Sequence, residues 1–100
     1  MRNYKAKVIR VVDGDTVDME FDLGFYVTTR VRTRLIGVDT PERGQPDFSM
    51  AKDMLTDLLR INTDQDGYVE VECHKTGKYG RWLVNIPNVN YTLANIWPYQ

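Results

Sequence analysis

Strict alternation marks the stretch Thr16-Val17-Asp18-Met19-Glu20-Phe21-Asp22-Leu23, in which the apolar residues share one face and three acidic residues share the other. A period of two predicts a β-strand that buries one face and exposes the other. The preceding Asp13-Gly14-Asp15 is a turn tripeptide, and it ends a stretch over 4–12 that is rich in β-branched residues. The sequence therefore opens with two strands joined by a tight turn.

The same reasoning extends along the chain. A third strand is predicted over 26–38, with Arg30, Arg32 and Arg34 on one face. A helix is predicted over 48–61, because apolar residues recur there at helical spacing. Two more strands are expected over 68–74 and 82–86, followed by a short amphipathic helix over 89–97.

This order of elements favours a mainly β fold with helices, of the α+β class. Three strands, a helix and two strands suit a five-stranded barrel of the OB type, with its main helix between strands three and four and a short C-terminal helix. A generic α+β sandwich is the alternative. With 100 residues, of which 42% are apolar, we expect residues 1–100 to form a single domain.

Composition narrows the classes of function. A formal charge of −1 argues against a protein that coats nucleic acid, because such proteins bind through many cations. An enzyme needs positive charge only locally, from a metal ion or a few arginines. The lone Cys73 excludes an internal disulfide, and with one histidine it excludes a cysteine/histidine zinc cage.

The chain has no apolar run long enough to span a membrane, and its start lacks the apolar core of a secretory signal. We therefore expect no membrane partner, and a protein that is either intracellular or already processed.

Two clusters of carboxylates follow predicted strands, Asp13-Gly14-Asp15-Thr16 and Asp39-Thr40-Pro41-Glu42. Calcium is bound by carboxylate and carbonyl oxygens, so Asp15 and Asp39 could hold it if the barrel brings both strand ends together. The alternatives are an ordinary turn for the first cluster and a helix start with a cap and proline for the second.

Cations complete the pattern. Arg34 and Arg81 lie beside apolar strand residues, where they either form carboxylate salt bridges or converge on a phosphate as bidentate donors. Lys78 and Tyr79 offer a cation and an aromatic face that could contact a nucleotide, and the alternative is that they only form a hairpin turn. We expect Trp82, Trp97 and the methionines to pack in the core, His74 to be solvated, and Arg30 and Arg32 to form an exposed face.

These clusters, in this order, resemble the staphylococcal nuclease-like (thermonuclease) family over about residues 8–84. The resemblance implies an OB-fold barrel and a calcium-dependent nuclease, in which water attacks phosphorus in DNA or RNA and leaves 3′-phosphorylated products.

The resemblance also implies a role for each matching residue. Asp15, Asp39 and the Thr40 carbonyl would bind calcium, and Asp13 would reach it through water. Glu42 would be the general base or orient the attacking water. The residues that would hold the phosphates of the substrate are Arg34, Arg81, Lys78 and Tyr79.

This chain also departs from the family pattern. The loops after Glu42 and before Lys78 are short, and most of a third helix is missing, so only Tyr91, Trp97 and Tyr99 remain to stack on a base. We expect a monomer and a weaker nuclease, with single-stranded DNA or RNA as the favoured substrate. The alternatives are a non-catalytic OB-fold module that binds nucleic acid or protein, and a fragment that needs a partner chain.

Overall fold

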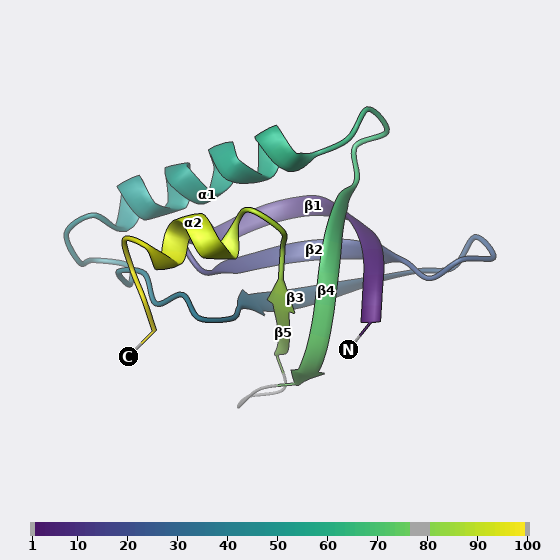
Figure 1. Cartoon of the computed structure of the whole chain (residues 1–100), viewed down its shortest axis with the longest axis horizontal. Helices are drawn as coiled ribbons and strands as arrows, with labels where there is room; N and C mark the ends of the chain where they lie inside the picture. The colour runs from purple at the N-terminus through teal and green to yellow at the C-terminus, as the bar shows by residue number, and fades with distance from the viewer. Residues whose placement is uncertain (1, 77–80, 100) are drawn as a thin grey trace.

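The computed structural model describes residues 2–76 and 81–99. It contains β1 (Arg2–Asp13), β2 (Thr16–Asp22), β3 (Thr28–Leu35), α1 (Phe48–Asn62), β4 (Val69–Thr76), β5 (Trp82–Asn85) and α2 (Asn90–Ala94) (Figure 1). The strands form a closed barrel in the order β1-β2-β3-β5-β4. Neighbouring strands are antiparallel except β3 and β5, which run parallel. The predicted OB-type barrel is therefore confirmed.

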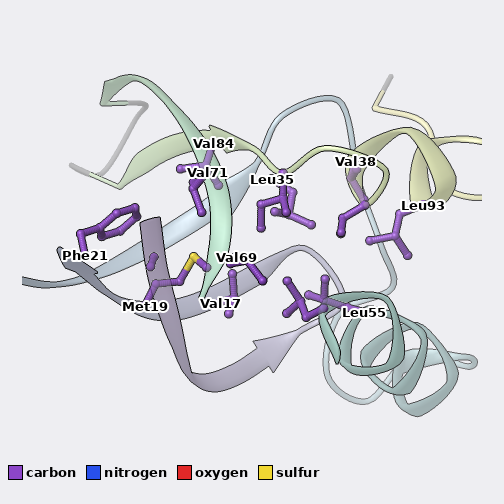
Figure 2. Packing of buried hydrophobic residues seen from close by; sticks show 14 residues of the cluster. Val17, Met19, Phe21, Leu35, Val38, Leu55, Val69, Val71, Val84 and Leu93 are labelled. Atoms are coloured by element: carbon purple, nitrogen blue, oxygen red, sulfur yellow. The ribbon is translucent and has the colours of Figure 1, made fainter. Parts of the chain in front are cut away.

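The core lies inside the barrel and beneath the two helices. Val17, Met19 and Phe21 are buried, as the alternation predicts, and they meet residues of the other strands such as Val71 and Val84. Figure 2 shows Leu55 of α1 and Leu93 of α2 entering the same cluster. Ala51, Leu55 and Leu59 are the buried residues of α1, and their spacing of four places them on one helical stripe.

The third strand is shorter than predicted. It covers Thr28–Leu35, because Phe25 and Tyr26 at one end and Gly37 at the other have positive φ angles of 54°, 61° and 77°. Left-handed backbone cannot continue a β ladder. The closing helix is also shorter, and Trp82, expected in the core, is 41% exposed.

Asn90 joins the closing helix to the barrel. It is only 4% exposed, yet its amide donates to the carbonyls of Ile36 at 2.9 Å and Val84 at 3.0 Å, and its Oδ1 accepts from the Ile86 N–H at 2.8 Å. A buried side-chain amide is tolerated when its hydrogen bonds are made. In the described part of the chain, no helix is long and apolar enough to cross a membrane.

Candidate functional site

The turn between β1 and β2 presses against the loop that follows β3. The Asp15 N–H donates to Asp13 Oδ1 at 3.1 Å, which is the local bond typical of an aspartate turn. A Cβ added at Gly14 would lie 2.7 Å from Thr40 Oγ1 and 2.8 Å from Ala51 Cβ. Glycine is therefore required here by the close approach of Thr40 and α1.

Arg34 connects the two carboxylate clusters. In β3 its Cα pairs with Thr16, and its side chain reaches past that residue to Asp15, with Nη1 2.7 Å from Oδ2. Nη2 donates to the Val38 carbonyl at 3.2 Å and lies 3.8 Å from Asp39 Oδ1. Asp15 and Asp39, separated in sequence, thus meet at one guanidinium, and the salt bridge considered for Arg34 is present.

Asp15 is the most enclosed acid of this group. It is 7% exposed, and Oδ2 accepts the Thr40 N–H at 3.2 Å while Oδ1 accepts the Thr16 hydroxyl at 3.0 Å. Burial by itself raises the pKa of Asp15, but hydrogen bonds from Asp13 and Arg34 outweigh it, so the pKa is lowered. Burial and the neighbouring Asp15 raise the pKa of Asp13. The site therefore keeps Asp15 ionised.

Residues 39–42 do not start a helix, so the helix-start interpretation is wrong. The helix begins at Phe48, after Asp47 in left-handed conformation, and the loop is fixed by other contacts. The Asp39 N–H donates to the Trp97 carbonyl at 3.0 Å. The Glu42 N–H donates to Gln45 Oε1 at 2.7 Å, and the Gln45 N–H returns to the Glu42 carbonyl at 2.9 Å.

Glu42 and Asp39 open onto a common hollow of about 390 Å³ that is also lined by Thr40, Pro41, Gln45 and Trp97. Glu42 is exposed, and within the described residues its carboxylate has no hydrogen-bond or ion-pair partner. The Asp39 side chain is 57% exposed. The hollow thus presents two accessible carboxylates beside an indole.

Arg81 lies immediately before β5. The parallel pairing places Leu83 beside Arg34, so Arg81 precedes this pair by two residues. At a strand rise of about 3.3 Å and a strand separation of about 4.8 Å, the Arg34 and Arg81 Cα atoms are roughly 8 Å apart. The Arg81 residue also has an interaction partner in the structure, so it is not free. Lys78 and Tyr79 lie outside the described residues.

The sequence analysis assigned no role in the site to Thr16, Gln45 or the main chain of Trp97. Gln45 follows Glu42 by three residues, a spacing that can close a turn, but a single glutamine carries little signal. The bond from the Asp39 N–H to the Trp97 carbonyl joins residues far apart in sequence, and no sequence pattern predicts it.

The oxygen atoms near Arg34 are of the type that binds a hard cation such as calcium. Asp15 and Asp39 offer carboxylates, and Thr40 offers a main-chain carbonyl. Over residues 2–76 and 81–99 there is no group of three or more His, Cys, Asp and Glu side chains that could hold a metal ion. A cation here would thus depend on main-chain and water oxygens as well as on two carboxylates.

Fold and site together define an OB-fold barrel with an arginine-bridged pair of aspartates where β3 ends. The chain is 33% identical over 81 residues to a micrococcal nuclease of Shigella flexneri, covering 81% of the chain and 41% of that relative. It is 34% identical over 83 residues to a thermonuclease of Staphylococcus hyicus, covering 80% and 46%. Protein ParB of Escherichia coli is 32% identical over 91 residues, covering 91% and 45%.

No protein-family model matches the chain. The relatives nevertheless support the resemblance found in the sequence: the chain is similar in sequence to these nucleases over about 80% of its length, and its fold is the OB-type barrel that the resemblance implies. It spans less than half the length of each of these relatives.

Proposed function

We propose that this chain is a calcium-dependent nuclease that hydrolyses phosphodiester bonds of DNA or RNA, giving 3′-phosphorylated products. The observation that carries the proposal is the convergence of Asp15, Arg34 and Asp39, with the Arg34 guanidinium 2.7 Å from Asp15 and 3.8 Å from Asp39. The nuclease names of two relatives support the reaction class.

Asp15, Asp39 and the Thr40 carbonyl would hold the calcium ion, and Asp13 would bind it through water. When bound, calcium supplies positive charge that polarises the phosphate and orients the reactants. The Arg34–Asp15 pair then acts as a support, because a short, largely buried ion pair holds Asp15 ionised and in one position.

Glu42 would receive the proton of the attacking water. A base must be accessible to water and have a free lone pair, and the exposed Glu42 carboxylate meets both conditions. The water oxygen forms a bond to phosphorus, the bond from phosphorus to the 5′-oxygen breaks, and the leaving oxygen takes a proton from solvent. Arg34 and Arg81 would stabilise the growing charge on the phosphoryl oxygens, with Lys78 and Tyr79 contacting the neighbouring nucleotide.

A second candidate, a nucleic-acid-binding module without catalysis, is favoured by one observation. Both carboxylate oxygens of Asp15 already have partners: Oδ2 contacts Arg34 and the Thr40 N–H, and Oδ1 accepts the Thr16 hydroxyl. Such a module would bind a phosphate at Arg34 without needing Asp15 as a metal ligand.

Incubation of labelled single-stranded DNA with the protein, in calcium and then with a chelator, separates the two candidates. We expect cleavage in calcium and none with chelator, with a 3′-phosphate on the new end. Binding without cleavage in both conditions would favour the module, and equal cleavage in both would remove the metal from the mechanism.

A further inference from the structure

The connection between β2 and β3, which we call the hairpin tip and define as residues 24–27, has an unusual composition for its geometry. The Val27 N–H donates to the Gly24 carbonyl at 2.9 Å, and the two central residues, Phe25 and Tyr26, have φ angles of 54° and 61°. Two positive φ values at these positions define a type I′ turn, which favours Asn-Gly. Two aromatic residues there are strained.

Among the described residues, burial of the two rings does not compensate for this strain. Phe25 is 97% exposed and Tyr26 is 106% exposed, so neither ring buries appreciable surface against the protein. Figure 1 shows the hairpin projecting beyond the rest of the barrel, at the end away from α2. Strained, exposed residues of this kind are explained by contact with a ligand better than by stability.

A line of arginines connects the hairpin tip to the candidate site. Arg30, Arg32 and Arg34 occupy alternate positions of β3 and thus share its outer face. We call them the arginine row. The Arg30 side chain is 73% exposed and pairs with Glu20 at 3.2 Å, and the Arg32 side chain is 52% exposed and pairs with Asp18 at 2.8 Å.

The face around this row has an excess of positive charge. Glu20 is flanked in register by Arg30 on β3 and Lys7 on β1, and Asp18 is flanked by Arg32 and Arg10. Asp18 thus lies between two arginines, whereas the ammonium of Lys7, the neighbour of Glu20 in register, lies 5.0 Å from the centroid of the Tyr68 ring. The acids hold the arginine side chains in place while the face as a whole still attracts an anion.

We propose that the arginine row and the hairpin tip bind a single strand of nucleic acid that extends from the candidate site. This inference rests on the proposed function and adds a second contact region for the substrate. Phosphates would lie on Arg32 and Arg30, and bases would stack on Phe25 and Tyr26. Exposed aromatic rings next to a cationic path are the combination that binds single strands without sequence preference.

The length of the path sets the length of the strand. Eight residues of chain separate Tyr26 from Arg34, which at about 3.3 Å each in extended conformation is roughly 26 Å. A stacked strand rises about 3.4 Å per nucleotide, so about eight nucleotides span the distance. An oligonucleotide of about ten nucleotides reaches the hairpin tip, and a dinucleotide bound at Arg34 does not.

The first test replaces the turn residues with those the turn prefers, in the double variant Phe25→Asn/Tyr26→Gly. Affinity for a fluorescein-labelled oligothymidylate of about ten nucleotides is measured by anisotropy, with chelator present to prevent cleavage. We expect binding about ten-fold weaker than wild type, with an undiminished melting temperature. Ile61→Asn, at a position that is 73% exposed on α1, is the matched control and retains wild-type affinity.

The second test uses charge. Arg30→Gln removes an exposed arginine paired with an acid at 3.2 Å, and Arg60→Gln removes a similar arginine on α1, 77% exposed and also paired at 3.2 Å. The logarithm of the oligothymidylate affinity falls linearly with the logarithm of salt concentration. The slope should decrease by about 0.7 for Arg30→Gln and remain that of wild type for Arg60→Gln.

The outcomes separate this inference from the proposed function. Cleavage by wild type, with both hairpin-tip and Arg30 variants binding the long strand as wild type does, overturns the inference alone. Absence of any binding or cleavage by wild type overturns both. Self-association of the wild type that the hairpin-tip variant abolishes, without a change in oligothymidylate affinity, assigns the hairpin tip to a protein contact and also overturns the inference.

Discussion

The two ends of β3 differ in how far their side chains are buried and bonded within the fold. At one end the Arg34 side chain is 19% exposed, and its two terminal nitrogens contact Asp15 and the Val38 carbonyl within the fold. At the other end Phe25 and Tyr26 are almost wholly exposed and their backbone is strained. One end is stabilised by the fold, and the other is available to a ligand. Substitutions at the candidate site should therefore lower stability or rate, whereas those at the hairpin tip should not lower stability.

The largest effect is expected at the candidate site, from Glu42→Gln. An amide cannot accept the proton of the attacking water, so turnover of single-stranded DNA should fall by about 100- to 10,000-fold, much more than affinity. Steady-state kinetics in calcium measure both quantities. Glu70→Gln, on the outer side of β4, is the control and keeps the wild-type rate. An unchanged turnover number in Glu42→Gln would remove Glu42 from the reaction.

The next effect concerns stability at the same end of β3. Asp15→Asn leaves the largely buried Arg34 without its carboxylate, which should lower the free energy of unfolding by about 2 to 3 kcal/mol. Asp18→Asn removes the carboxylate from the more exposed pair with Arg32 and should cost less than about 1 kcal/mol. Urea denaturation of both variants tests the contrast, and equal losses would contradict it.

Acid should weaken the same contact. The folded pKa of Asp15 lies below the ordinary 3.8, so its contribution to stability is complete above 3.8 and is lost as the pH falls through the folded value. The difference in unfolding free energy between wild type and Asp15→Asn should therefore be constant at neutral pH and shrink below about pH 4. Urea denaturation at a series of pH values measures it, and a difference that grows on acidification would reverse the assigned sign.

The smallest effect is expected at the hairpin tip, with the opposite sign. Phe25→Asn/Tyr26→Gly relieves two unfavourable φ angles and removes no buried contact, so the free energy of unfolding should rise by about 1 kcal/mol. Thermal denaturation measures the change. A loss of stability would show that the aromatic pair supports the fold, and the contrast between the two ends would fail.

The elements that the sequence predicts well are those with a local pattern. Alternation over 16–22 and the spacing of Ala51, Leu55 and Leu59 depend only on the period of one strand or helix, and both are seen. The predicted pattern fails at its last residue, because Leu23 lies beyond the end of β2 and is 44% exposed. The hairpin tip was missed because Phe25 and Tyr26 are β-forming residues that lack the usual turn signature. Trp82 was misplaced because alternation gives the face of a strand but not how far the barrel covers its end.

The candidate site also has a part that the sequence predicts and a part that it does not. Asp15, Arg34 and Asp39 were predicted as a set from residue type and family resemblance, and the structure brings these three together. Their roles as metal ligand or catalytic residue stay predictions. The long-range support of the site was not predictable, because the bond from the Asp39 N–H to the Trp97 carbonyl depends on the folded path of the chain.

The most direct test of the central claim, that the aspartates meeting at Arg34 form a calcium site, is calorimetric titration of the protein with calcium. Wild type should bind one ion per chain, and Asp39→Asn should lose most of the affinity. Asp57→Asn is the matched control, because Asp57 has similar side-chain exposure, 62% against 57%, and also lies near an arginine. Binding retained in Asp57→Asn and lost in Asp39→Asn supports the claim, whereas no binding by wild type, or equal binding by wild type and Asp39→Asn, contradicts it.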